Sequence, residues 1–260
     1  MKIVVCVKQV LDPRGFTVNR KAEKVFVNRE EYVLDPASNV ALRVASTVKS
    51  ALEASNGATP PEIVAMSLGP DRVDDALREA MAFGAGRAIH LKDAAFESAD
   101  AMVAAHALAA AIGKLGGADL VLLGARSLDT SSGELPPRLA EALDLPHAAN
   151  AVSLDVREGR AWIVAKHGDS FTRFSTPLPV VVSVIPEAFE TGYASGWRLM
   201  DAYKKWSVEA WSAADLSMTE DDLRPGAVKK GEAFPAERQF GTRVGDAAEL
   251  AEILRRERVI

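Results

Sequence analysis

Apolar runs alternate with helix-like apolar spacings through the first two thirds of the chain. Uninterrupted apolar runs at residues 3–7 (IVVCV) and 180–184 (VVVSV) predict strands that are buried on both faces. Further strands are predicted at residues 63–68, 87–91 and 120–123. Helices are predicted from residue 36 and at residues 71–83, 99–115 and 135–143. This alternation predicts an α/β fold with a doubly wound, mostly parallel sheet and right-handed crossovers.

The pattern changes twice along the chain. Residues 151–156, 162–166 and 170–175 read as antiparallel strands around a Glu158-Gly159 turn, and residues 11–34 as a loop with a hairpin around residues 20–24. From about Pro186 the periodicity is lost. We expect residues 186–260 to form an arm that wraps another subunit and ends in a helix at residues 246–256. Its expected aromatic anchors are Trp197, Trp206, Trp211, Phe234 and Phe240.

Composition narrows the class of protein. At 260 residues, 48% apolar and 26% charged, the chain is typical of a globular protein. A net charge of −5 without a basic run argues against nucleic-acid binding. The lone Cys6 excludes an internal disulfide and a cysteine-based metal site. No apolar stretch is long enough for a membrane span, and the first strand begins too early for a signal peptide, so we expect a cytoplasmic protein.

The richest candidate site lies in residues 118–146, ADLVLLGARSLDTSSGELPPRLAEALDLP. An apolar strand ends at Gly124, a hydroxyl-rich loop follows, and a helix opens behind two prolines. Backbone N–H groups and the hydroxyls of Ser127, Thr130, Ser131 and Ser132 would then face the carboxyl end of a parallel strand, a natural place for a nucleotide phosphate. A capped helix start without a ligand explains the same residues, and the loop lacks a known glycine fingerprint. Both interpretations stay open on spacing alone.

Two other strand ends should lie near this loop. They are residues 5–8 and 67–70, and the helix start at residues 35–38 should face the same crevice with Asp35 as its cap. Cys6 sits among valines, which indicates core packing rather than a reactive thiol. The four histidines show no metal-ligand spacing, and no nucleophile triad or paired-carboxylate motif is present. The sequence therefore predicts a binding protein with no catalytic and no metal-binding residues of its own.

Residues 193–205 (YASGWRLMDAYKK) read as an exposed loop running into a short basic helix. A solvated surface helix is one interpretation. The other is a partner-docking patch, because Trp197 stands beside cations, a composition favoured at interface hot spots.

Several segments, taken in order, resemble one known family. They are VCVKQVLDP at residues 5–13, VLDPASNVALRVASTVK at 33–49, IVAMSLGPDRVDDALREAMAFGAGRAIHL at 63–91, DLVLLGARSLDTSSGELPPRLAEALDLP at 119–146, and LPVVVSV at 178–184. Tyr193-Ala194, Met200 and Lys204-Lys205 continue the similarity. The chain resembles the β subunits of electron transfer flavoproteins over essentially its whole length.

The resemblance implies a fold, cofactors and partners. The fold is adenine nucleotide alpha hydrolase-like, with residues 1–185 as the nucleotide-binding domain. In that family an α subunit carries the redox FAD and the β subunit buries AMP or, in bifurcating members, a second FAD; we favour AMP, because the loop lacks the fuller acidic and glycine pattern of bifurcating members. Electrons pass from a soluble donor dehydrogenase to the FAD and on to a membrane quinone reductase. Nothing in the resemblance implies direct membrane insertion of this chain.

Carried over residue by residue, the resemblance also implies two sites. The nucleotide pocket would use Cys6, Asp35, Pro36, Ala37, Ser38, Leu68, Gly124, Ala125, Arg126, Ser127, Leu128, Asp129, Thr130, Ser131, Ser132, Gly133, Glu134 and Leu135. The loop that docks the donor dehydrogenase would use Tyr193, Gly196, Trp197, Arg198, Leu199 and Met200.

The sequence departs from the family pattern at five positions. Gly196 replaces a usual leucine, Glu134 a glutamine and Pro136 a glycine, while Pro13 and Ala37 stand where aromatic residues often flank the partner's flavin. An alternative function is a stand-alone adenine-nucleotide-binding protein of the stress-protein type, with a triphosphate at residues 124–133; the aromatic-anchored arm argues against it. An NAD-dependent dehydrogenase would need G-x-G-x-x-G after the first strand, where KQVLDPRG stands instead.

Overall fold

The computed structural model describes residues 1–55, 60–97, 99–190, 192–228, 230–231, 233–236, 241 and 243–260. Phe240, one of the expected anchors, lies outside these ranges. Residue contacts divide the chain into two units, which we describe separately. Unit 1 comprises Met1–Thr17 and Phe26–Val228, and unit 2 comprises Val18–Val25 and Lys229–Ile260. Both hydrophobic clusters lie in unit 1.

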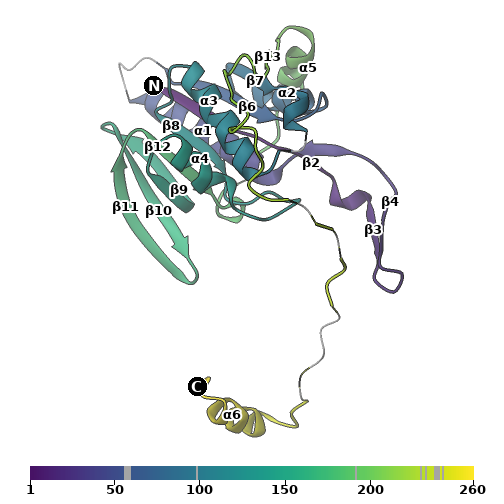
Figure 1. The fold of residues 1–260 in the computed structure, drawn as a ribbon. Coiled ribbons are helices and arrows are strands. Elements are labelled where there is room, and N and C mark those ends of the chain that lie inside the picture. The colour runs from purple at the N-terminus through teal and green to yellow at the C-terminus, as the bar shows by residue number, and fades with distance from the viewer. Residues whose placement is uncertain are drawn as a thin grey trace. The chain divides into compact units, whose positions relative to one another are not determined.

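A nine-stranded mixed sheet forms the centre of unit 1 (Figure 1). Its order is β11-β10-β9-β12-β8-β1-β6-β7-β13. The strands are β1 (Lys2–Cys6), β6 (Glu62–Leu68), β7 (Arg87–Leu91), β8 (Leu120–Gly124), β9 (His147–Arg157), β10 (Arg160–His167), β11 (Ser170–Pro177), β12 (Val180–Val184) and β13 (Glu209–Trp211). Neighbours from β9 through to β13 pair in parallel, whereas β9, β10 and β11 pair antiparallel. The predicted α/β fold with a doubly wound, mostly parallel sheet is therefore confirmed.

Strand β1 occupies the middle of this sheet. Ile3 pairs with Ile63 of β6 on one side and with Leu120 of β8 on the other. Val4 and Val5 point to opposite faces and are both fully buried. An uninterrupted apolar run is stable here because helices cover both faces of the sheet.

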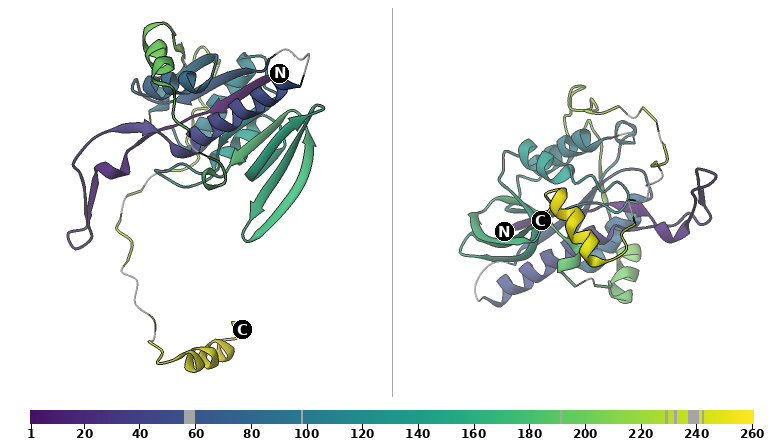
Figure 2. Two further views of the ribbon diagram at one scale, coloured as in Figure 1. Left: turned by 180° about the vertical axis from the view of Figure 1, so that it is seen from behind. Right: turned by 90° about the horizontal axis from the view of Figure 1, so that it is seen from below.

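Four helices cover the sheet, two on each face (Figure 2). Helices α1 (Pro36–Ala54) and α2 (Val73–Phe83) pack with Ile3 and Val5, and helices α3 (Ala101–Lys114) and α4 (Leu135–Ala142) pack with Val4 and Cys6. The predicted Asp35 cap of α1 is confirmed, and Gly84, at φ 125°, ends α2.

Short elements complete the N-terminal half. Strand β2 (Gln9–Leu11) pairs with β5 (Tyr32–Leu34), and β3 (Phe16–Asn19) forms a two-stranded sheet with β4 (Lys24–Val27). The second pair confirms the predicted hairpin. The predicted turn between β9 and β10 is confirmed as well, with Glu158 and Gly159 both at positive φ, as a two-residue hairpin turn requires. The 3-10 helices are η1 (Pro13–Gly15), η2 (Ala94–Phe96) and η3 (Pro186–Ala188).

Part of the segment expected to wrap a partner packs instead on its own domain. After helix α5 (Gly196–Lys204), strand β13 extends the sheet beside β7, and Ala213 and Leu216 are buried behind it. Trp206 and Trp211, two of the expected anchors on another subunit, are partly buried against the two clusters of their own unit 1. Without β13, the backbone N–H and C=O groups on the outer edge of β7 would be unpaired, and β13 pairs with them.

The described residues of unit 2 include one helix, α6 (Ala247–Arg256). The side chain of Asp246 caps it by accepting a hydrogen bond from the backbone N–H of Glu249, at 2.9 Å, which confirms the predicted helix. Leu250 of α6 has an exposed fraction of 43%. No α6 residue is buried. Among the described helices of the whole chain, none is both long enough and apolar enough to cross a membrane.

Candidate functional site

A cavity of about 420 Å³ opens at the carboxyl ends of β1, β6 and β8. We call it the main pocket. Its volume suits a small-molecule ligand, and strand ends of this kind are where open α/β sheets bind ligands. Its lining residues are Cys6, Val7, Lys8, Asp35, Ser38, Ser67, Leu68, Ala99, Asp100, Ala101, Ala104, Leu108, Leu123, Gly124, Ala125, Arg126, Ser127, Thr130, Ser132, Gly133, Glu134, Leu135 and Pro136. The three strand ends expected to converge therefore do so.

An adjoining pocket of about 500 Å³ shares Asp35, Ala125, Arg126 and Ser127 with the main pocket. Four predicted site residues line only this second pocket: Pro36, Ala37, Leu128 and Ser131. Its remaining walls come from Asn150, Lys166, Gly168, Ile185, Pro186 and Glu187. The predicted site is thus divided between two neighbouring spaces.

The loop after β8 approaches α1 closely. A Cβ added at Gly124 would lie 2.4 Å from the Cβ of Ala37, so only glycine fits at this contact. Further along, Ser131 at φ 50° and Gly133 at φ 67° turn the chain back toward α4. These positive φ values give the loop a defined bent shape.

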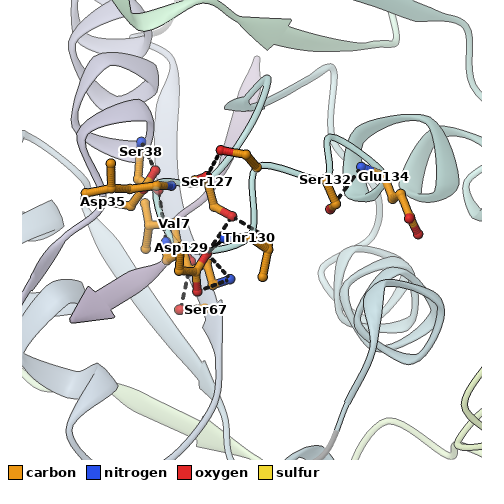
Figure 3. A network of polar contacts seen from close by, with 12 residues as sticks. Val7, Asp35, Ser38, Ser67, Ser127, Asp129, Thr130, Ser132 and Glu134 are labelled. Carbon is orange, nitrogen blue, oxygen red and sulfur yellow. Dashed lines mark hydrogen bonds and ion pairs between the residues drawn. The ribbon is translucent and has the colours of Figure 1, made fainter. Parts of the chain in front are cut away.

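Asp35 joins this loop to the start of α1 (Figure 3). One carboxylate oxygen accepts hydrogen bonds from the N–H groups of Ala37 and Ser38, at 3.1 and 3.2 Å. The other accepts from the N–H of Leu128 at 2.8 Å. Burial raises the pKa of Asp35 although these hydrogen bonds act in the opposite direction. The N-terminus of α1 is therefore already occupied by a carboxylate and not open to a phosphate.

A second carboxylate, Asp129, gathers the donors inside the loop (Figure 3). It accepts from the Ser127 hydroxyl and the Thr130 N–H, each at 2.7 Å, and pairs with the Lys8 ammonium at 2.7 Å. Burial opposes ionisation of Asp129, but the hydrogen bonds from Lys8 and Ser127 outweigh it and lower its pKa. Asp129 is one of the predicted site residues, but it lines neither of the two pockets.

The expected donors of the loop are only partly free. Ser131 donates both its N–H and its hydroxyl to the carbonyl of Ser127, at 3.0 and 3.2 Å. Ser132 accepts a long hydrogen bond of 3.5 Å from the N–H of Glu134 (Figure 3). Of the loop hydroxyls, those of Thr130 and Ser132 belong to the lining of the main pocket without being bound to a carboxylate.

Cys6 lies in the wall of the main pocket with an exposed fraction of only 6%. Burial raises the pKa of its thiol to about 12. The thiol stays protonated near neutral pH and is a poor nucleophile, which agrees with the packing role expected for it. Across the described ranges, no three His, Cys, Asp or Glu side chains are grouped to hold a metal ion.

The predicted docking residues lie on and before α5. Tyr193 and Trp197 are 99% and 79% exposed, and Met200 is 47% exposed. Leu199 is half-buried. Arg198 turns back onto the domain, where its guanidinium donates to the carbonyls of Met81 and Ala82, at 3.1 and 2.8 Å. Gly196 begins the helix and leaves that position without a side chain.

Sequence reasoning missed the wall that α3 contributes. Ala101, Ala104 and Leu108 recur at helical spacing on one face of α3 and line the main pocket. The sequence predicts a helix at residues 99–115 and assigns none of its residues to the site. Small residues in the first turns of a helix that follows a parallel strand are the signal that was available, because such a helix passes beside the carboxyl edge of the sheet.

The fold and the pocket together define a doubly wound α/β domain with a small-molecule-sized pocket at its strand ends. The profile of the family described as electron transfer flavoprotein domain matches residues 24–216. The chain belongs to the electron transfer flavoprotein domain family.

Named relatives agree with this membership. The chain is 29% identical to the electron transfer flavoprotein subunit beta of Clostridium acetobutylicum over 234 residues, covering 88% of this chain and 87% of the relative. It is 28% identical to the caffeyl-CoA reductase-Etf complex subunit CarD of Acetobacterium woodii, covering 84% and 81%. The FixA protein of Rhizobium meliloti is 29% identical, with 85% and 75% covered. The resemblance to electron transfer flavoprotein β subunits is thereby confirmed.

Proposed function

We propose that this chain is the β subunit of a cytoplasmic electron-transferring heterodimer and holds AMP in its main pocket. An α subunit bearing FAD accepts electrons from a soluble donor dehydrogenase and passes them to a membrane quinone reductase. The observation that carries the proposal is a ligand-sized pocket at the strand ends of a chain from the electron transfer flavoprotein family.

The residues of the main pocket fit an adenylate. Leu68, Ala104, Leu108 and Leu123 supply apolar walls of the kind that an adenine ring requires. Arg126, Thr130 and Ser132 supply polar groups where the phosphate would lie. The AMP has a structural role, and the α-subunit FAD supplies the redox chemistry. This chain contributes a rigid platform, a bound nucleotide and a docking surface on α5, and it performs no bond-making step of its own.

A second FAD in place of AMP is the other candidate. The adjoining pocket is the observation in its favour, because a dinucleotide needs space beyond that of AMP. We favour AMP because the loop lacks the fuller acidic and glycine pattern associated with bifurcating members.

The test is to co-express the chain with the electron transfer flavoprotein α subunit of its own organism and purify the complex. Denaturation and chromatography then count the nucleotides released per complex. We expect a yellow heterodimer with one FAD and one AMP. Two FAD and no AMP would overturn the choice of AMP. A colourless homodimer that ignores the α subunit would overturn the heterodimer and favour a stand-alone nucleotide-binding protein.

A further inference from the structure

We propose that Arg126 is the residue that makes the main pocket select a phosphorylated nucleoside over the bare nucleoside. The inference deepens the proposed function, since it concerns the same pocket. It arises because the usual anion-binding groups around this pocket are absent or already engaged.

The N-terminus of α4 offers few donors. Helix α4 begins at Leu135 and continues with Pro136 and Pro137. A helix normally presents its first free N–H groups to an anion, but proline has no N–H. Two of these donors are thus missing where the loop meets the pocket. The Glu134 carboxylate at the same helix start adds a negative charge that disfavours an anion.

Two cations beside the loop, Lys8 and Arg138, are engaged with carboxylates. Lys8 contacts both oxygens of Asp129, at 2.7 and 2.9 Å. Arg138 pairs with Glu134 at 3.1 Å. Each pair neutralises itself and leaves little positive charge for a ligand.

Arg126 differs from these two cations. It is exposed and lines both pockets, and none of its contacts among the described residues is with a carboxylate. A Cβ added at Gly133 would lie 3.4 Å from Cγ and 3.6 Å from Nε of Arg126, so the side chain crosses directly over the turn. This turn carries the donors that remain free. The guanidinium of Arg126 therefore lies beside the turn where a phosphate would bind.

The chemistry of the guanidinium suits this role. Its planar N–H groups bind a phosphate through two parallel charge-assisted hydrogen bonds. Among the described residues that line the main pocket, Lys8 is paired with Asp129 and Arg126 is the cation left without a carboxylate partner, so Arg126 decides whether an anion is retained. The bare nucleoside makes no use of that charge.

The experiment uses the full-length chain, stripped of bound nucleotide, and measures the dissociation constants of AMP and adenosine by calorimetry. We expect Arg126→Gln to raise the dissociation constant of AMP by about tenfold or more, while that of adenosine changes by less than about twofold. Arg126→Lys should retain part of the preference, because it keeps the charge and loses the planar geometry. Arg173→Gln is the matched control, because it removes the same charge. Arg173 is exposed on β11 and lines neither pocket.

The outcomes separate this inference from the proposed function. If Arg126→Gln leaves the ratio of the two dissociation constants unchanged while the wild-type chain binds AMP, Arg126 is not the selecting residue and the nucleotide site stands. An equal loss of AMP affinity in Arg173→Gln would also overturn the inference, because net charge alone would then explain the effect. If the wild-type chain binds neither compound, the proposed AMP site fails together with the role of Arg126.

Discussion

At the scale of single residues, buried carboxylates hold the candidate site together. Asp35 is 2% exposed and binds three backbone N–H groups from two segments that are far apart in sequence. A side chain with one acceptor atom cannot serve the N–H groups of both Ser38 and Leu128. Asp35 therefore determines the position of the β8–α4 loop relative to α1, and with it the width of the main pocket.

The pKa of Asp35 leads to a prediction about stability and pH. Because burial raises its pKa above the ordinary 3.8, the folded protein keeps this proton at pH values where the unfolded chain has released it. The contribution of Asp35 to the free energy of unfolding therefore falls as the pH rises through that interval. Urea unfolding of wild type and Asp35→Asn at a series of pH values should show the stability difference shrinking toward higher pH.

Two further observations complete that experiment. The asparagine turns an N–H group toward a backbone donor, so a loss of about 1–3 kcal/mol is expected near neutral pH. Asp169→Asn, at an exposed turn, is the control and should show neither effect. A stability difference that grows toward higher pH would mean that the hydrogen bonds outweigh burial and lower the pKa.

At the scale of elements, α5 and α2 hold each other through reciprocal arginines. Arg198 of α5 donates to the carbonyls at the end of α2, and Arg78 of α2 donates to the carbonyls of Ala202 and Trp206 at the end of α5. The Tyr203 hydroxyl adds a 2.7 Å hydrogen bond to Asp75. Arg198 satisfies the Ala82 carbonyl and Arg78 the Ala202 carbonyl, which these helix ends leave free, while the Met81 carbonyl also accepts from the N–H of Gly84. Helix α5 is therefore held firmly while its outer face stays exposed.

Removing one arginine should loosen α5 without unfolding the domain. We expect Arg198→Ala and Arg78→Ala each to accelerate hydrogen exchange of the α5 amides, with a local cost of about 1–3 kcal/mol because each leaves at least one helix-end carbonyl without a donor. Lys204→Ala, an exposed cation on the same helix, should leave exchange unchanged. Unaltered α5 exchange in both arginine variants would show that apolar packing alone holds the helix.

Elements whose own residues carry a pattern were predictable, and those defined by a distant partner were not. Strand β12 reads as VVVSV and lies where the apolar run placed it, and the Asp35 cap and Gly84 stop are visible in the sequence. Strand β13 is Glu-Ala-Trp, which has no periodicity, and it exists because β7 offers it backbone partners. Strand β9 begins four residues earlier than expected, since His147 and Ala148 pair with β12.

The candidate site divides in the same way. The strand ends and the hydroxyl-rich loop were recognisable because they are local features of the chain. The engagement of Asp129 by Lys8 was not, since these residues are distant in sequence and meet only in the folded sheet. The α3 wall was hidden for a related reason, because alanines that line a pocket look the same as alanines in a core.

At the scale of the whole molecule, the end of the chain has two parts of different character. Residues up to Val228 belong to unit 1, where the Asp93 carboxylate accepts from Ala213 N–H at 3.0 Å and Asp100 accepts from Ala227 N–H at 2.9 Å. Residues after Val228 belong to unit 2, which contains neither hydrophobic cluster. The residues after Val228 are therefore the best candidates for the arm of this chain that we expect to wrap the α subunit.

Two truncations test this division. A chain ending at Val228 should unfold at the same urea midpoint as the full chain, because both clusters remain, while its affinity for the α subunit falls. A chain ending at Val208 loses β13 and the buried Ala213 and Leu216, and should lose more than about 3 kcal/mol of stability. Equal stability of the two truncated chains would contradict the assignment of residues 209–228 to the domain.

The central position of β1 has a consequence for biosynthesis. This strand is made before both of its neighbours, and Ile3 finds its partners only when Ile63 and then Leu120 have been made. Such distant pairings slow folding and leave an apolar segment unprotected in the nascent chain. Recruitment of a chaperone to the nascent chain, before Leu120 has been made, is the expected result.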